Sequence, residues 1–142
     1  MPSFTTKVPN LKEAGPIVDV GITVGAVVEE LLKKTSQPIP PPIKTVAMID
    51  TGATGTVIRE DLVQRLNLNP VGVVMINTPS CTNLACYEYA VRIIFPGNVV
   101  ADIVAIAAPL QGQHIQCLVG RDILGKGVFI YTGYVDTFTL SF

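Results

Sequence analysis

Hydrophobic positions alternate with other residues at a period of two in several parts of the chain, which is typical of half-buried β-strands. The first such segment covers residues 18–24, and Gly25 ends it. Further strands are predicted between prolines and glycines, at residues 46–49, 71–76, 87–95, 99–107 and 116–119. Segments 128–131 and 137–142, with a turn around Gly133, predict a hairpin. Many short strands with few helices predict an all-β, barrel-like domain.

Two segments have the periodicity of amphipathic helices. Over residues 26–34 the apolar positions fall at helical spacing, and Glu29/Lys33 and Glu30/Lys34 form i,i+4 pairs on the opposite side. A second short helix is predicted over residues 59–66 and ends at Asn67, a residue type that tolerates the left-handed conformation.

Four prolines between positions 38 and 42 follow the first helix. Proline lacks a backbone donor and fixes φ, so this run predicts an extended surface linker. A ligand for an SH3-type domain is the alternative interpretation. We expect one domain over residues 1–142, with a helical and proline-rich insertion at 15–42.

The composition changes this picture in two ways. Hydrophobic residues make up 49% of the chain and charged residues 15%, below the usual charged share of about 25%. Much surface must therefore be buried in the fold or against a partner, which favours an oligomer. The net charge is −1 and no block of lysine or arginine occurs, so nucleic-acid binding is not expected.

Targeting and metal-binding signals are weak. No apolar run approaches the ~20 residues of a membrane-spanning helix, and the start of the chain lacks the order of a secretory signal. Cys81, Cys86 and Cys117 are an odd number without metal-ligand spacing, and His114 is the single histidine. We therefore expect no membrane segment, metal or cofactor, and a reducing, cytoplasmic location. A processed form of a longer precursor would look the same.

The candidate chemistry begins where the apolar strand at 46–49 runs into Asp50-Thr51-Gly52-Ala53. Asp50 can act as an acid or base. Gly52 permits backbone conformations and close approaches that other residues forbid. The hydroxyl of Thr51 can donate a hydrogen bond that holds the loop, and Ala53 leaves room beside the carboxylate. These residue types are also ordinary turn formers, so the triplet alone is weak.

A second motif, LVGRDIL at residues 118–124, follows several further strands, and TVI at 56–58 follows the first motif closely. Together the motifs resemble the retropepsin-like aspartic protease family, over residues 43–142. The short helix after the first motif is similar to that of cellular and bacterial members. The resemblance implies a retropepsin-like acid-protease barrel with one or two short helices.

The resemblance also implies roles for individual residues. Asp50 would be the catalytic carboxylate, Thr51 would grip its counterpart across a dimer axis, and Gly52 would contact the substrate backbone. The expected substrate-binding residues are Ala53, Thr54, Asn77 and Thr78.

The strand at 118–120 would pass beside the catalytic loop, and Arg121 and Asp122 would open the helix behind it. One departure stands out. Viral members usually carry an acidic residue where this chain has Thr54, so the usual acidic partner of Arg121 is missing.

Residues 75–89 align with the family's flap, a hairpin that folds over bound peptide, with its tip expected within 78–84. An ordinary surface hairpin is the alternative. Cys81 and Cys86 flank this tip. They could form a redox-controlled bridge, although two spectator thiols fit a reducing compartment better.

The chain contains a single Asp-Thr-Gly triplet. Asp102, Asp122 and Asp136 are not followed by Thr-Gly or Ser-Gly, and the chain is too short for two lobes. A second carboxylate would therefore come from another copy, as two-fold symmetry allows. We expect a homodimeric aspartic endopeptidase acting on peptide or protein substrates.

Two alternatives stay open for the function. The domain could bind peptides or dimerise without turnover, or residues 1–42 could hold a protease inactive until they are removed or displaced. The strand at 137–142 could be shared across the dimer axis, as the chain ends of viral members are, or could close its own hairpin with 128–131.

Overall fold

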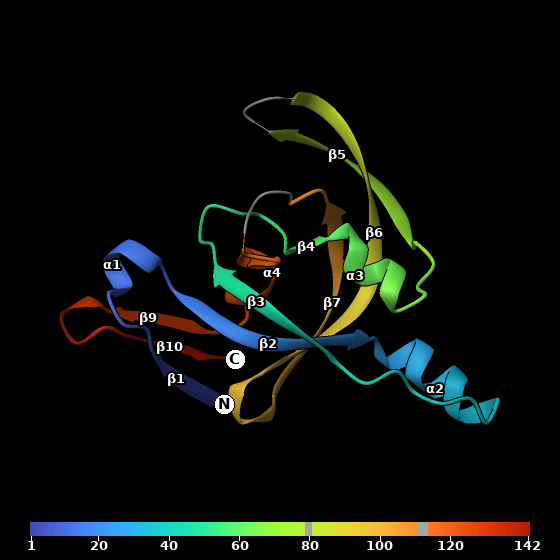
Figure 1. The fold of residues 1–142 in the computed structure, drawn as a ribbon, viewed down its shortest axis with the longest axis horizontal. Coiled ribbons are helices and arrows are strands. Elements are labelled where there is room, and N and C mark those ends of the chain that lie inside the picture. The colour runs from blue at the N-terminus through green and yellow to red at the C-terminus, as the bar shows by residue number, and fades with distance from the viewer. Residues whose placement is uncertain (79–80, 111–113) are drawn as a thin grey trace.

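The strands lie in two sheets, which the computed structural model describes for the whole chain except residues 79–80 and 111–113 (Figure 1). The larger sheet has the order β2-β3-β8-β4-β7-β6-β5, and a further pairing of β2 with β6 closes all of its strands except β5 into a ring. The smaller sheet has the order β1-β10-β9. The strands are β1 (Ser3–Lys7), β2 (Ile17–Val24), β3 (Ile43–Ile49), β4 (Val57–Arg59), β5 (Gly72–Thr78), β6 (Cys81–Phe95), β7 (Val99–Ala108), β8 (Cys117–Val119), β9 (Val128–Thr132) and β10 (Thr137–Ser141).

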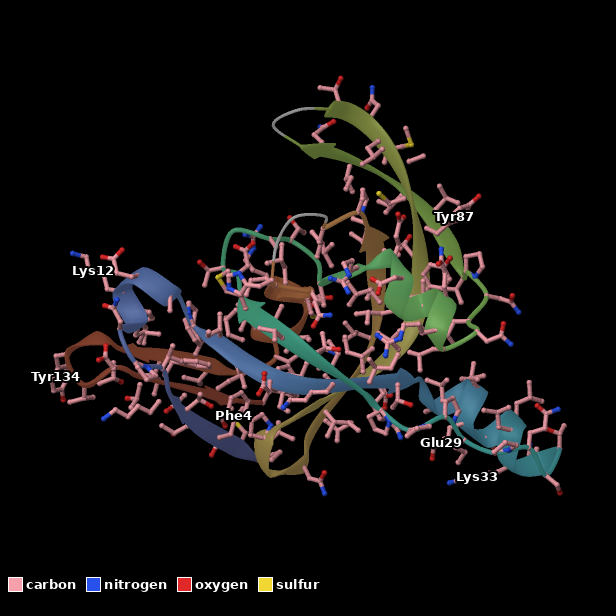
Figure 2. The ribbon with its side chains drawn as sticks, in the orientation of Figure 1. Phe4, Lys12, Glu29, Lys33, Tyr87 and Tyr134 are labelled. Atoms are coloured by element: carbon pink, nitrogen blue, oxygen red, sulfur yellow. The ribbon has the colours of Figure 1, made fainter. Side chains whose placement is uncertain are left out.

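The helices of the described residues are short. They are α1 (Leu11–Ala14), α2 (Ala26–Lys34), α3 (Glu60–Arg65), α4 (Arg121–Leu124) and the 3₁₀ turns η1 (Pro96–Asn98) and η2 (Gly133–Val135). The prediction of an all-β domain with few helices is confirmed. Both predicted helices form, and Asn67 closes the second at φ 53°. The expected pair of Glu29 and Lys33 forms at 3.0 Å on α2 (Figure 2).

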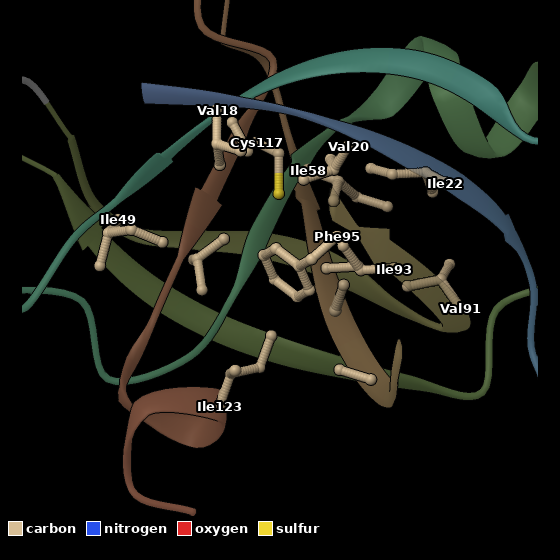
Figure 3. Close-up of a cluster of buried hydrophobic side chains, with 14 of the residues drawn as sticks. Val18, Val20, Ile22, Ile49, Ile58, Val91, Ile93, Phe95, Cys117 and Ile123 are labelled. Atoms are coloured by element: carbon tan, nitrogen blue, oxygen red, sulfur yellow. The ribbon is translucent and has the colours of Figure 1, made fainter. Parts of the chain in front are cut away.

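The interior of the ring holds the main hydrophobic core. Buried positions alternate along β2 and β6 because successive side chains of a strand point to opposite faces. Figure 3 shows side chains from elements far apart in the sequence meeting there, among them Val18, Ile58, Phe95 and Cys117 of the strands and Ile123 of α4. Burying a large apolar side chain contributes about 1.5–3 kcal/mol, so this cluster fixes the strands that carry the candidate site.

The C-terminal strand β10 is the central strand of the smaller sheet. It pairs antiparallel with β1 on one side, with Phe4 opposite Leu140, and with β9 on the other, with Phe129 opposite Leu140. Phe138 and Leu140 are fully buried, and Phe4 stacks on Phe95 at 5.5 Å, which joins the small sheet to the barrel. Of the two arrangements considered for this strand, the chain adopts the hairpin with β9.

Strands β5 and β6 form a long antiparallel hairpin that arches away from the barrel (Figure 1). Cys81 and Cys86 lie five residues apart on β6, about 16 Å at the rise of an extended strand. A disulfide needs Cα atoms within about 7 Å. A bridge between these two cysteines would therefore require β6 to open, and Cys86 is a buried free thiol.

Candidate active site

Asp50 lies at the point where β3 ends, and two strands fix it there. Strand β3 runs parallel to β8, with Ile49 beside Val119. The backbone N–H of Asp50 donates to the carbonyl of Val119 at 2.9 Å, and the N–H of Ile49 donates to the carbonyl of Pro16 at 3.0 Å. The backbone of Asp50 is therefore anchored on the barrel while its half-buried carboxylate starts the following turn.

The turn after Asp50 closes on its own carboxylate. Oδ1 of Asp50 accepts the N–H of Gly52 at 2.9 Å, and the Asp50 carbonyl accepts the N–H of Ala53 at 3.2 Å. A Cβ atom at Gly52 would lie 3.2 Å from Oδ1, tighter than nine in ten real Cβ contacts. The carboxylate is oriented by a backbone donor, and Thr51, Gly52 and Thr54 are exposed beside it.

The corner between β8 and α4 packs directly against this turn. A Cβ atom at Gly120 would lie 2.5 Å from the carbonyl of Gly55, so only glycine permits this approach. The N–H of Arg121 donates to the carbonyl of Ala53 at 2.9 Å. The second motif thus lies beside the Asp50 loop, as the resemblance implies.

A buried hydrogen-bond network joins the two motifs. The hydroxyl of Thr56 donates to Oδ1 of Asp122 at 2.7 Å, and its N–H donates to Oδ2 at 3.1 Å. The same hydroxyl accepts the N–H of Gly120 at 3.1 Å. The sequence motifs contain these residues, but their contact was not predicted. A polar residue directly before a short apolar strand is the signal that could have indicated it, because buried polar groups are almost always paired.

The guanidinium of Arg121 contacts two neutral acceptors, because position 54 carries a threonine instead of an acidic residue. Its Nη1 donates to the carbonyl of Thr51 at 2.7 Å, and its Nη2 lies 3.3 Å from the hydroxyl of Thr54. None of the ion pairs among the described residues includes Arg121. The guanidinium therefore braces the loop from both ends of the turn.

The predicted substrate-binding residues fall into two groups. Ala53 and Thr54 lie in the loop after Asp50, whereas Asn77 and Thr78 lie at the end of β5. The side chain of Asn77 accepts the N–H of Asn83 at 3.0 Å across the hairpin. The expected tip includes residues 79–80, which lie outside the described residues, as does the side chain of Thr78. Within the described part, no hydrogen bond joins this hairpin to residues 50–54.

Cys117 lies in the hydrophobic core, on β8 (Figure 3). Burial raises the pKa of its thiol to about 12, and the negative charge of Asp122 acts in the same direction. The thiol is therefore neutral and protected below the site.

A separate cavity of about 560 Å³ lies elsewhere, between α2, β6, β7 and α4, and residues 50–54 do not line it. Among the described residues, no group of three or more His, Cys, Asp and Glu is placed to hold a metal ion. No helix in the described part is long and apolar enough to cross a membrane.

Comparison with known proteins gives a family and two similar folds. Residues 43–123, more than half of the chain, match the family described as aspartyl protease. A search of curated proteins found no match. The fold is similar to the solution structure of the simian foamy virus protease, with 17% identity and a TM-score of 0.49 over 77% of this chain and 91% of that chain. It is also similar to the crystal structure of a retropepsin-like aspartic protease from Rickettsia conorii, with 13% identity and a TM-score of 0.48 over 99% and 94% of the two chains.

Proposed function

Since the chain belongs to the aspartyl protease family, as its two motifs predicted, we propose that it is an endopeptidase in which Asp50 activates the attacking water. The observation that carries this proposal is the geometry of the loop. The Asp50 carboxylate follows a buried strand, accepts the N–H of Gly52 at 2.9 Å and is half-buried. A carboxylate oriented by a backbone donor, with one side open, suits general acid–base chemistry.

The working enzyme in this proposal is a homodimer. The described chain offers one Asp-Thr-Gly loop, and a single carboxylate cannot be base toward water and acid toward a carbonyl at once. Thr51 is exposed next to Asp50, and its carbonyl is held by Arg121 at 2.7 Å. This arrangement supports a role for the Thr51 side chain in gripping a second copy of the loop across a two-fold axis.

Two carboxylates brought together in this way share one proton, because both cannot ionise cheaply at short distance. The charged Asp50 takes a proton from water as the oxygen attacks the scissile carbonyl carbon. The protonated Asp50 of the other copy gives its proton to the carbonyl oxygen, which forms a neutral tetrahedral diol. Collapse of the diol breaks the C–N bond as the leaving nitrogen takes the proton of the protonated carboxyl and the charged carboxylate takes a proton from one diol hydroxyl. The products are an amine and a carboxylic acid, and the dyad again holds one proton. The proposed steps use only the two carboxylates and water.

The proposed substrate is an extended peptide segment bound between the catalytic loop and the β5/β6 hairpin. Val73, Met75 and Tyr87 are exposed apolar side chains of this hairpin, and the first and last of these lie opposite each other across it. Backbone hydrogen bonds with apolar contacts between them are how sheet edges recognise extended peptides. In this proposal the hairpin is a flap, and Ala53, Thr54, Asn77 and Thr78 line the peptide.

Incubation with a diverse peptide library from acidic to neutral pH, with and without pepstatin, tests the proposal. We expect cleavage that pepstatin inhibits, and none with the Asp50→Asn protein, since Asn keeps the volume but cannot take the proton. Circular dichroism would show that the variant is folded. Binding of peptides without cleavage would instead identify a peptide-binding domain, and cleavage by pure Asp50→Asn protein at the wild-type rate would exclude Asp50 as the catalytic group.

A further inference from the structure

We propose that a cavity between α3 and the β5/β6 hairpin binds the side chain of an arginine that belongs to a peptide or protein partner. The cavity has a volume of about 410 Å³, within the range of about 300–1,000 Å³ that is usual for ligand pockets. Residues 50–54 do not line it. The inference therefore goes beyond the proposed function, because binding here requires neither cleavage nor a second copy of the chain.

The cavity forms where α3 lies next to the base of the hairpin (Figure 1). Its walls are mostly apolar and include Val63 of α3, Leu84 of β6 and Ala107 near the end of β7. Helix α3 directly follows β4, and β4 pairs with β7, so two of these walls belong to the barrel and the third belongs to the hairpin. Apolar walls of this kind suit the methylene stem of a long charged side chain.

Glu60 supplies the negative charge of the cavity. It is the only aspartate, glutamate, lysine or arginine among the described residues that line the cavity. None of the ion pairs in the described part of the chain includes Glu60. The neighbouring Arg59 donates through two of its nitrogens to Asp61 instead. A carboxylate without a cationic partner at the wall of an apolar cavity favours a cationic ligand.

The charge of Glu60 also acts on a buried group of the same cavity. Cys86 lines the cavity and is 5% exposed. Burial raises the pKa of the Cys86 thiol, and the negative charge of Glu60 acts in the same direction. The carboxylate therefore lies close to the interior of the cavity, and the neutral thiol adds no charge of its own.

The other polar and aromatic residues favour a guanidinium over an ammonium group. Gln64 lines the cavity one helical turn after Glu60, on the same face of α3. Together the two side chains offer acceptor oxygens that match the several donors of a guanidinium. Tyr87 and Tyr89 of β6 also line the cavity, and guanidinium groups stack on aromatic rings more often than ammonium groups do. The lining is therefore complementary to arginine.

The experiment is an NMR titration of the full chain carrying Asp50→Asn, a change that prevents cleavage in the proposed mechanism. The probe is a capped tripeptide with arginine between two glycines. Its control carries citrulline, which has the shape of arginine without the charge. We expect saturable shifts of the amide signals of residues 60–64 and 84–89 with the arginine peptide. The dissociation constant should be about tenfold higher for the citrulline peptide, because a hydrogen bond to a charged group is lost.

Two variants test the role of the carboxylate. Glu60→Gln keeps the size of the side chain and should raise the dissociation constant of the arginine peptide about tenfold. Gln64→Lys keeps Glu60 but gives it a cation at i,i+4 spacing, so it should weaken binding in the same direction. The matched control is Glu13→Gln, which removes an exposed carboxylate of α1 and should keep the original dissociation constant.

Several outcomes would overturn the inference. These are equal binding of the arginine and citrulline peptides, an unchanged dissociation constant in both Glu60→Gln and Gln64→Lys, and shifts confined to residues 50–54, which would place the peptide in the active site. An equal loss in Glu13→Gln would also overturn it, because the net charge of the protein would then attract the peptide. Equal binding of a tripeptide with lysine would overturn the choice of arginine.

The proposed function is tested separately. Wild-type protein that binds the arginine peptide at this cavity but cleaves no peptide of the library would overturn the proposed endopeptidase and leave the arginine site standing. Wild-type protein that cleaves peptides while the Asp50→Asn chain shows no saturable shifts at residues 60–64 and 84–89 would overturn the arginine site alone.

Discussion

The carboxylate of Asp122 accepts hydrogen bonds from both polar groups of Thr56, from the hydroxyl at 2.7 Å and from the backbone N–H at 3.1 Å. Thr56 is fully buried, and its hydroxyl accepts the N–H of Gly120 in turn. This network ties the residue before β4 to α4, next to the loop that follows Asp50. The loop geometry therefore depends on residues that do not touch the substrate in the proposed mechanism.

Replacing Thr56 with valine should lower the free energy of unfolding by about 1–3 kcal/mol, because Asp122 and the N–H of Gly120 each lose a partner inside the protein. Thr56→Ser keeps the hydroxyl and is the matched control, with a smaller loss expected. Urea denaturation of the three proteins measures the difference. Equal stabilities for the valine and serine variants would show that the network does not stabilise the fold.

Gly120→Ala should destabilise the protein strongly, because its Cβ would lie 2.5 Å from the backbone of Gly55 and no side chain can move aside. Overpacking of this kind costs about 1–3 kcal/mol or more. Gly55→Ala is the control, since its Cβ would meet Ile106 at an ordinary 3.6 Å. Thermal unfolding should show a lower midpoint for Gly120→Ala alone; similar midpoints would mean that the corner between β8 and α4 relaxes.

Local patterns in the sequence predicted much of the fold, because they depend on neighbouring residues. The helix α2 follows from the spacing of its apolar residues, and β2 follows from its alternation. Strand β1 was not predicted, because Ser3–Lys7 is mostly polar and becomes a strand by pairing with β10 at the other end of the chain. Pairing over such a distance leaves no mark in a local window.

In the site, too, features that depend on neighbouring residues could be predicted, and contacts between distant residues could not. The motif around Asp50 could be recognised from its residue types, since the turn needs a glycine and a small neighbour. The acceptors of Arg121 could not be predicted, because one is the backbone carbonyl of Thr51, which any residue would supply. The sequence left open whether β10 is shared across a dimer axis or forms a hairpin with β9. In the structure β10 pairs with β9 on one side and with β1 on the other, and no local pattern indicated the pairing with β1.

Arg121→Lys should lower cleavage more than stability. A single ammonium group cannot bind the Thr51 carbonyl and reach the Thr54 hydroxyl with the fixed geometry of a guanidinium. We expect kcat/KM to fall about tenfold or more, the equivalent of ~1.4 kcal/mol. Steady-state kinetics and urea denaturation on the same samples separate the two effects.

Thr54→Asp should strengthen the contact between position 54 and Arg121, because it would place a carboxylate beside the guanidinium. The pair is exposed, so the gain in the free energy of unfolding should be within about 1 kcal/mol. A stability unchanged by Thr54→Asp together with unchanged cleavage by Arg121→Lys would remove Arg121 from the support of the loop.

Cys117 should make the protein less stable at alkaline pH. Burial raises the pKa of this thiol from 9.0 to about 12. Below about pH 9 the thiol is neutral in both the folded and the unfolded protein, so this contribution to stability is fully present. As the pH rises from about 9 toward 12, the thiol ionises in the unfolded protein alone, so the free energy of unfolding falls. Urea denaturation between pH 8 and about 10.5 should show a steeper loss for wild type than for Cys117→Ala. Parallel curves for the two proteins would contradict this assignment.

Mixtures of wild-type protein with the Asp50→Asn variant distinguish a shared pair of carboxylates from a single one. If two Asp50 carboxylates act together, a mixed dimer has one carboxylate and is inactive. An equal mixture at constant total protein should then retain about one quarter of the activity of pure wild type after the subunits exchange, because random pairing forms wild-type dimers with that frequency. If each chain acted alone, about one half would remain. The measurement uses substrate in large excess, so that binding by inactive dimers does not lower the rate, and an unrelated protein replaces the variant in the control mixture. Activity that follows the amount of wild-type chain, rather than its square, would show that one Asp50 is sufficient and that the second carboxylate in the proposed mechanism is not required.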